Sequence, residues 1–330
     1  MEQKRQKPHE RLAEILSADM EAVGQLIRAR IASRHAPRIP EVTAHLVEAG
    51  GKRLRPLLTL AAARLCGYDG DSHVKLAATV EFIHTATLLH DDVVDESAQR
   101  RGRPTANLLW DNKSSVLVGD YLFARAFQLM TEPGDLRVLT ILSDAAATIA
   151  EGEVLQLSVA RDLGTSEETY LQVVRGKTAA LFAAATQVGG VIAKRPENEI
   201  KALYDYGEAL GIAFQIVDDL LDYEGSDATG KNIGDDFRER KLTLPLIKAL
   251  AQADEAEYAF WTRTIAKGDQ HEGDLEEALA ILERRGALDA ARQDALIWGA
   301  RARSAMESFA PSELRDLLIG VNDYVIERLS

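Results

Sequence analysis

The feature that most constrains this chain is a pair of carboxylate clusters, each near the C-terminal end of a long segment with helical apolar periodicity. Both clusters read Asp-Asp-x-x-Asp: Asp91, Asp92 and Asp95 in the first, and Asp218, Asp219 and Asp222 in the second. On a helix, the first and last carboxylates of each cluster lie about 40° apart around the axis and one turn apart along it. Each cluster therefore presents two carboxylates on one face of a helix.

Carboxylates this close repel each other, and their position at a helix C-terminus opposes the helix dipole. A solvated helix end could explain either cluster taken alone. The apolar neighbours Leu88, Leu89 and Val93, together with a second copy on another apolar helix, favour a metal site instead. Hard divalent cations prefer oxygen ligands, so Mg2+ is the predicted ion.

Basic residues stand beside these acidic clusters. Lys52 and Arg55 lie at a predicted helix start, where free N–H groups and the positive end of the dipole favour an anion. Arg100 and Arg101 follow the first cluster, and the planar guanidinium group suits phosphate oxygens. A solvated surface explains any one pair alone, but their joint placement indicates a diphosphate site.

The composition excludes several classes of protein. A net charge of −13 argues against an extended nucleic-acid surface, and 46% hydrophobic residues exclude a disordered chain. The one cysteine, Cys66, cannot form an internal disulfide and suits a reducing cytoplasm. The apolar run at 179–193 is too short and polar to span a membrane, and residues 1–11 lack a signal core, so no stable membrane insertion is expected.

Helical periodicity covers almost the whole chain, and Gly or Pro recurs where helices should end. Helices are predicted at 10–34, 52–65, 74–95, 114–130, 136–160, 168–188, 199–223 and 242–251, followed by three or four shorter ones. Gly189 and Gly190 are predicted to begin a break that lasts to Pro196. We expect one all-α domain over residues 1–330, with helices packed around a central pair.

The motifs together resemble those of trans-type polyprenyl diphosphate synthases, in particular the long-chain bacterial group that includes octaprenyl and decaprenyl diphosphate synthases. The resemblance is clearest between residues 50 and 245, where five motifs follow the family order. They are GGKRLRP at 50–56, LLHDDVVDESAQRRGR at 88–103, GKT at 176–178, FQIVDDLLD at 214–222, and GK at 230–231 with GDD at 234–236. The resemblance implies a single-domain helical bundle of the isoprenoid synthase type around a central cavity, and a homodimer.

Position by position, the resemblance also assigns roles. The implied Mg2+ ligands are Asp91, Asp95 and Asp218, with Asp92, Asp219 and Asp222 in or just behind the coordination shell. The implied contacts to isopentenyl diphosphate are Lys52, Arg55, His84 and Arg101, and those to the allylic diphosphate are Arg100, Lys177, Lys231 and Lys241. Thr178 and Gln215 would face the reacting carbons. Where the family commonly has Gly before its last lysine, this chain has Arg240.

The implied reaction is head-to-tail prenyl transfer by Mg2+-assisted ionisation, condensation and proton elimination. In the family, bulky residues four and five places before the first Asp stop chain growth early. The small residues Thr87 and Ala86 stand there, so we expect a long product suited to a quinone side chain.

Three alternatives are a shorter, geranylgeranyl-type synthase, a class I terpene cyclase, and a non-catalytic subunit that sets product length in a heteromeric synthase. A cyclase normally replaces the second acidic cluster with an Asn/Ser/Glu pattern, and a non-catalytic subunit tends to lose one cluster. This chain keeps both.

Overall fold

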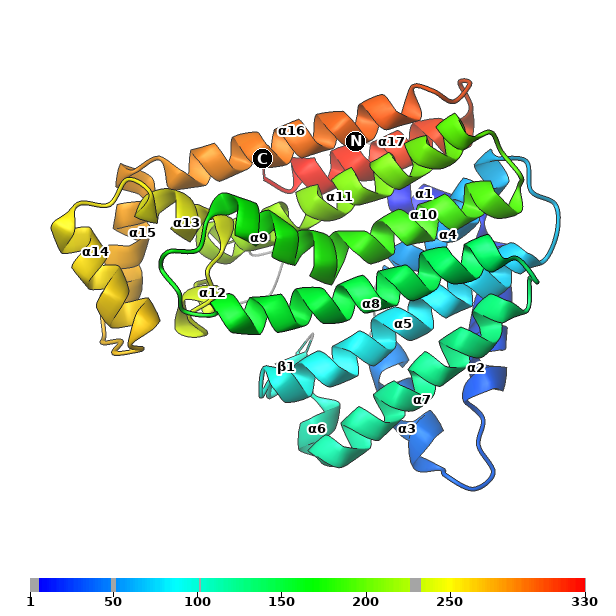
Figure 1. The fold of residues 1–330 in the computed structure, drawn as a ribbon, viewed down its shortest axis with the longest axis horizontal. Coiled ribbons are helices and arrows are strands. Elements are labelled where there is room, and N and C mark those ends of the chain that lie inside the picture. The colour runs from blue at the N-terminus through cyan, green and yellow to red at the C-terminus, as the bar shows by residue number, and fades with distance from the viewer. Residues whose placement is uncertain (1–5, 49–51, 101, 226–232, 330) are drawn as a thin grey trace, which may run out of the picture. The chain divides into compact units, whose positions relative to one another are not determined.

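The computed structural model describes residues 6–48, 52–100, 102–225 and 233–329. Helices make up nearly all of these ranges (Figure 1), and their only strands form an antiparallel ribbon of β1 (Gln99–Arg100) and β2 (Arg103–Pro104). The prediction of an all-α fold is therefore confirmed. No helix within these ranges combines the length and the apolar character that crossing a membrane requires.

The chain forms two compact units. Unit 1 comprises Met1–Ala146, Leu181–Tyr204 and Ser308–Gly320, and unit 2 comprises Ala147–Ala180, Asp205–Glu307 and Val321–Ser330. Helices α8 (Leu136–Val159), α11 (Glu197–Glu224) and α17 (Glu313–Glu327) contribute residues to both units. Each unit carries one carboxylate cluster, and the single domain over residues 1–330 remains a prediction.

Unit 1 is organised around one helix that is buried on most of its sides. Its helices are α1 (Pro8–Ile15), α2 (Ser17–Ile31), α3 (Arg38–Glu48), α4 (Leu54–Leu65), α5 (Ser72–Val94), α6 (Ala106–Leu109), α7 (Asn112–Thr131) and α10 (Ala180–Ile192). Helix α5 packs against α2, α4 and α7. Its large apolar residues Leu76, Val80 and Ile83 are fully buried, and so are Ala77 and Ala78 on other sides of the helix. A helix that is apolar all round belongs in a core.

Two predicted boundaries in unit 1 are wrong. The helix predicted at 10–34 is two helices, because the backbone leaves helical geometry at Leu16 (φ −98°, ψ 20°). The break predicted at Gly189 does not exist, since α10 continues to Ile192. A Cβ atom added at Gly189 would lie 2.6 Å from the backbone nitrogen of Ala63 in α4. This glycine therefore allows two helices to pack closely and does not make a turn.

Unit 2 surrounds a second apolar core. Its helices are α9 (Glu167–Val174), the π-helical turn η1 (Arg175–Ala179), α12 (Asp235–Arg238), α13 (Leu244–Leu250), α14 (Glu255–Trp261), η2 (Thr262–Ala266), α15 (Asp274–Arg284) and α16 (Ala287–Met306). Tyr223 at the end of α11 packs in this core with Phe237, Trp261, Leu246 and Ile281. The core thus holds the end of the helix that carries the second carboxylate cluster.

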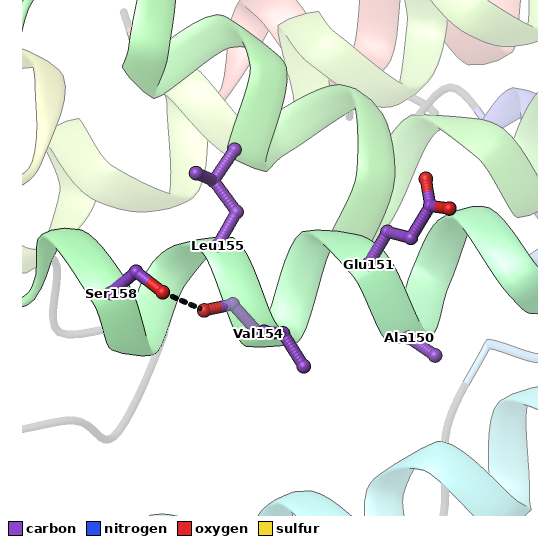
Figure 2. A pocket seen from close by; sticks show the side chains of 5 residues that line it. All are labelled: Ala150, Glu151, Val154, Leu155 and Ser158. Atoms are coloured by element: carbon purple, nitrogen blue, oxygen red, sulfur yellow. Dashed lines mark hydrogen bonds between the residues drawn. The ribbon is translucent and has the colours of Figure 1, made fainter.

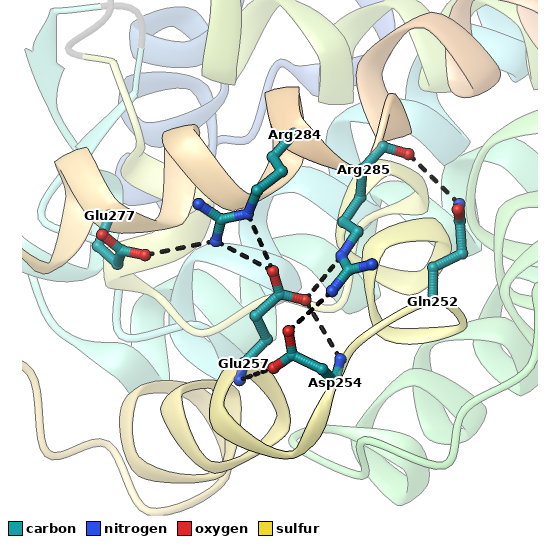
Figure 3. Close-up of polar contacts among 6 residues, drawn as sticks. All are labelled: Gln252, Asp254, Glu257, Glu277, Arg284 and Arg285. Carbon is teal, nitrogen blue, oxygen red and sulfur yellow. Dashed lines mark hydrogen bonds and ion pairs between the residues drawn. The ribbon is translucent and has the colours of Figure 1, made fainter.

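A network of charged groups joins α14 to the end of α15 (Figure 3). Its centre is Glu257, which is buried and accepts hydrogen bonds from Arg284 Nη2 (3.0 Å) on one oxygen and from Arg285 Nε (2.8 Å) on the other. Burial acts to raise the pKa of Glu257, but the hydrogen bonds from Arg285 and Arg284 outweigh burial and lower it. This network contains no predicted site residue and stabilises the local helix packing.

Candidate active site

The three carboxylates at the end of α5 have different environments. Asp92 is fully buried, Asp91 is half-buried, and Asp95, the C-cap residue of the helix, is exposed. Arg100 approaches Asp92 Oδ1 with both Nε and Nη2, each at 2.8 Å. The buried Oδ2 atom of Asp92 has no hydrogen-bond partner among the described residues. Burial raises the pKa of Asp92, although Arg100 acts in the opposite direction.

The residues expected to bind isopentenyl diphosphate lie on α4 and α5 of the same unit. Lys52 is exposed just before α4, and Arg55 lies in its first turn. Arg55 Nη1 is 3.3 Å from His84 Nε2, and the Arg55 guanidinium carbon lies 4.3 Å from the centroid of the Phe182 ring. The aromatic ring and the imidazole together orient the guanidinium group. The structure thus brings Arg55 and His84 together, whereas Arg101 lies outside the described residues.

The two residues expected to set product length lie in the last turns of α5. Ala86 is fully buried and Thr87 is half-buried. Thr87 Oγ1 donates a hydrogen bond to the backbone carbonyl of His84 (2.8 Å), which directs the hydroxyl back to the helix. Both positions therefore hold small side chains without an extended polar group.

The second carboxylate cluster, near the end of α11, also has a buried middle carboxylate that accepts hydrogen bonds. Asp219 and Asp222 are buried, and Asp218 is half-buried. Asp219 accepts a hydrogen bond on each oxygen: the Tyr170 hydroxyl donates to Oδ2 (2.6 Å) and Gln215 Nε2 donates to Oδ1 (2.9 Å). In both clusters, the middle carboxylate is buried and held by neighbouring donors, while the first carboxylate is partly accessible to solvent.

The GKT motif forms η1, the π-helical turn between α9 and α10. Such turns are rare and often occur at functional sites. Thr178 Oγ1 donates to Gln215 Oε1 (3.0 Å), and Lys177 Nζ donates to Glu153 Oε2 of α8 (2.9 Å). The structure therefore brings the predicted residues Thr178 and Gln215 into direct contact.

The segment after α11 adds a further carboxylate and a lysine. The backbone N–H of Asp236 donates to Asp222 Oδ2 (3.0 Å), and Lys241 Nζ lies 3.6 Å from Asp236 Oδ1. Arg240 has a φ of +59°, a left-handed conformation that glycine adopts most easily. The backbone thus keeps a glycine-like conformation where the family commonly has Gly. Lys231 lies outside the described residues.

Burial, and after it repulsion between neighbouring carboxylates, opposes ionisation of Asp219 and Asp236 in unit 2. Burial raises the pKa of Asp219, with a further contribution from the charge of Asp218. Burial, together with the charges of Asp219 and Asp222, raises the pKa of Asp236. A cation bound near these groups would offset the repulsion.

The donor atoms suit a hard cation, because they are carboxylate oxygens. Among the described residues, no group of three acidic, histidine or cysteine side chains could hold a metal by itself. Mg2+ usually takes only one or two protein carboxylates and completes its octahedron with water and substrate phosphates. The half-buried Asp91 and Asp218, each next to a buried carboxylate, fit that mode of binding.

An open pocket lies along one face of α8 (Figure 2). Its lining residues are Ala150, Glu151, Val154, Leu155 and Ser158. The Ser158 hydroxyl donates to the backbone carbonyl of Val154 (2.8 Å), so its polar group is already satisfied within the helix. No predicted site residue lines this pocket, and its apolar side chains suit packing better than chemistry.

Two residues in this region lie outside every motif. Tyr170 contacts Asp219, which is 49 positions away in the chain, and Glu153 contacts Lys177, 24 positions away. No local sequence pattern marks either contact, because the partners come together only through helix packing. The alternation of buried and exposed residues in α9 places Tyr170 in the core but does not indicate its partner.

Known proteins resemble this chain over most of its length. The polyprenyl synthetase family model matches residues 36–282. The octaprenyl diphosphate synthase of Escherichia coli is 44% identical over 320 residues, covering 97% of this chain and 98% of that protein. The structure of a decaprenyl diphosphate synthase from Rhodobacter capsulatus is 67% identical, with 98% of this chain and 99% of that chain covered and a TM-score of 0.95.

A further solved relative is a polyprenyl synthase from Caulobacter crescentus in complex with calcium and isoprenyl diphosphate. It is 48% identical, with 99% of this chain and 100% of that chain covered and a TM-score of 0.92. The matches to these relatives extend over nearly the full length of the chain. This chain belongs to the polyprenyl synthetase family.

Proposed function

We propose that this chain is a long-chain polyprenyl diphosphate synthase, which joins isopentenyl diphosphate head to tail with an allylic diphosphate. The observation that carries the proposal is that both carboxylate clusters are complete and share the arrangement of their first two carboxylates. In each, the middle carboxylate (Asp92 or Asp219) is held inward and the first (Asp91 or Asp218) is half-buried. Relatives named as octaprenyl and decaprenyl diphosphate synthases support the long product.

The proposed ligands of Mg2+ are Asp91, Asp95 and Asp218. Bound Mg2+ would neutralise charge on the allylic diphosphate and thereby favour cleavage of its C–O bond. Asp92 and Asp219 support the ligands next to them, because a carboxylate fixed by hydrogen bonds limits the motion of the adjacent helix residues. The complex of the Caulobacter crescentus relative with calcium is consistent with a divalent cation.

Lysine and arginine side chains would hold the allylic diphosphate: Arg100, Lys177, Lys231 and Lys241. Lys177 pairs with Glu153 in this structure, so we expect it to exchange that carboxylate for a phosphate oxygen when substrate binds. Thr178 Oγ1 and Gln215 Oε1 would face the reacting carbons, and both atoms carry partial negative charge. Electron-rich oxygens in fixed positions stabilise a developing allylic cation.

The electron and proton balance of the step needs no protein nucleophile. The C–O bond of the allylic diphosphate breaks, and its electron pair leaves with the diphosphate. The double bond of isopentenyl diphosphate supplies the pair for the new C–C bond, and the proton then lost passes to the departing diphosphate. Lys52, Arg55, His84 and Arg101 would hold isopentenyl diphosphate during this step, with Arg55 oriented by Phe182.

Product length would depend on Ala86 and Thr87, whose small side chains leave room for a growing hydrocarbon chain. A homodimer is also proposed, since α7 exposes the apolar side chains of Leu117 and Phe127. The single cysteine of the chain supports a cytoplasmic location.

The test uses the purified chain with Mg2+, labelled isopentenyl diphosphate and a series of allylic primers. We expect Mg2+-dependent incorporation of label and, by mass analysis, a product of about eight to ten isoprene units, as in the relatives named above. Asp218→Asn, which keeps the size of the side chain, should reduce incorporation strongly. A product of four units would favour the geranylgeranyl-type alternative. No incorporation with any primer would favour the non-catalytic subunit.

A further inference from the structure

We propose that Tyr170 is a positioning residue for prenyl transfer. Through Asp219, it fixes the side-chain amide of Gln215 so that the carbonyl oxygen, and not the NH2 group, lies beside Thr178. This inference rests on the proposed function and adds a residue that no motif contains.

The Tyr170 hydroxyl can only donate a hydrogen bond to Asp219, because a carboxylate has no proton to give. Tyr170 is buried in α9, whose N-terminus is capped by the Ser166 hydroxyl, and its hydroxyl donates to Asp219 Oδ2 at 2.6 Å. A tyrosine hydroxyl keeps its proton at neutral pH, because its ordinary pKa is about 10. Tyr170 is therefore a fixed donor to one oxygen of the carboxylate.

The carboxylate in turn determines the orientation of the amide. An amide side chain can present either its oxygen or its nitrogen, and the neighbouring groups decide which. A carboxylate only accepts hydrogen bonds, so Gln215 must turn Nε2 toward Asp219 Oδ1 (2.9 Å). This leaves Gln215 Oε1 on the opposite side, where it accepts from Thr178 Oγ1 (3.0 Å).

Without the Tyr170 hydroxyl, the orientation of the Gln215 amide would be less strictly fixed. Asp219 Oδ2 would lack its tyrosine donor, and only Gln215 and the backbone N–H of Leu244 would then orient the carboxylate about its χ2 bond. Gln215 could then turn its NH2 group toward Thr178 and present a positive edge where the allylic cation forms. A donor at that position opposes the transition state that an acceptor stabilises.

The direct test is Tyr170→Phe, which removes a single oxygen atom. We expect kcat to fall about 10- to 100-fold, because a misplaced dipole acts on the cation in the transition state. The KM for isopentenyl diphosphate should stay within about two-fold of the wild-type value, since uniform binding of that substrate is unaffected. Tyr223→Phe is the matched control, because Tyr223 is also buried but pairs with the Thr243 hydroxyl (3.1 Å). Its kcat should stay within about three-fold of wild type.

A double-mutant cycle separates positioning from mere loss of stability. If Tyr170 acts through Gln215, Tyr170→Phe should lower kcat by less than about two-fold in a Gln215→Leu background. Thermal melts of all variants monitor folding. If Tyr170→Phe does not fold, Tyr170→Met replaces it in the cycle, because methionine adapts to a buried site and carries no hydroxyl donor.

Three results would overturn the inference. An active wild type with unchanged kcat in Tyr170→Phe refutes it and leaves the proposed function intact. Losses that multiply in the double mutant show that Tyr170 acts independently of Gln215. A wild type that incorporates no label with any primer refutes the proposed function, and the inference fails with it.

Discussion

The contact between α8 and η1 should tolerate no side chain at Gly152 or Gly176. A Cβ atom added at Gly176 would lie 2.7 Å from Gly152 Cα and 3.0 Å from the carbonyl oxygen of Thr148. A Cβ added at Gly152 would lie 2.7 Å from the backbone nitrogen of Lys177. Each clash involves backbone, which cannot rotate away as a side chain can. These glycines therefore bring Lys177 within reach of Glu153.

The magnitude for Gly176→Ala follows from these distances. Ordinary contacts of a Cβ atom begin near 3.4 Å, so the two segments must separate by about 0.7 Å. Overpacking of this kind costs about 1–3 kcal/mol, and the better helix propensity of Ala returns at most about 1 kcal/mol. We expect a net loss of roughly 1–2 kcal/mol in the free energy of unfolding. A displacement of the GKT motif by this distance should also lower kcat at least about ten-fold.

The assay compares urea denaturation midpoints and kcat for wild type, Gly176→Ala and Gly24→Ala. Gly24 is a matched control in α2, where an added Cβ would have its nearest neighbour at 3.5 Å, at the end of the Arg28 side chain. Gly24→Ala should be neutral or more stable by up to about 1 kcal/mol, with unchanged kcat. Equal stability and activity of Gly176→Ala and Gly24→Ala would show that the backbone contact at Gly176 tolerates a side chain.

Three further predictions concern product length, acid stability and assembly. Ala86→Phe should shorten the product by at least one isoprene unit, and unchanged chain length by mass analysis would contradict the role of this position. Hydrogen bonds from Arg263 lower the pKa of Asp274 from 3.8 to about 2, so its carboxylate stabilises the fold above pH 3.8 and this contribution is lost as the pH falls toward 2. Asp274→Asn should therefore lower the free energy of unfolding by roughly 2 kcal/mol at pH 7. The difference from wild type in urea denaturation should shrink below pH 4, and a difference that does not depend on pH would refute this prediction. Leu117→Glu, at a side chain 66% exposed, should convert a dimer to folded monomers in sedimentation analysis, whereas an unchanged mass would place the interface elsewhere.

The helices that carry the two clusters were predictable because their apolar periodicity is long and uninterrupted. The helix predicted at 74–95 is α5, and the helix predicted at 199–223 is α11, each correct to within two residues at both ends. The break at Gly189 was predicted wrongly because a glycine pair has two possible structural roles. A glycine pair looks the same in sequence whether it makes a turn or permits close packing, and only the neighbouring helix decides between the two.

The candidate site also has features that the sequence predicted and features that only the tertiary structure shows. The sequence alone identified the carboxylates, the basic residues and the GKT motif, because these groups occur in compact local patterns with a recognisable order. It did not show that Asp92 is buried in the first cluster and that Asp219 and Asp222 are both buried in the second. That distinction requires Arg100 beside Asp92, and Tyr170 beside Asp219.

The sequence by itself thus determined the helical class, since periodicity is a local property of the chain, and its motifs indicated the family by resemblance and the chemical character of the site. Tertiary structure decided the π-helical turn at Lys177, the close glycine contact beneath it and the hydrogen-bond chain from Tyr170 to Thr178. These features join residues tens of positions apart, and their geometry depends on how neighbouring helices pack. No local pattern in the chain encodes such a distance.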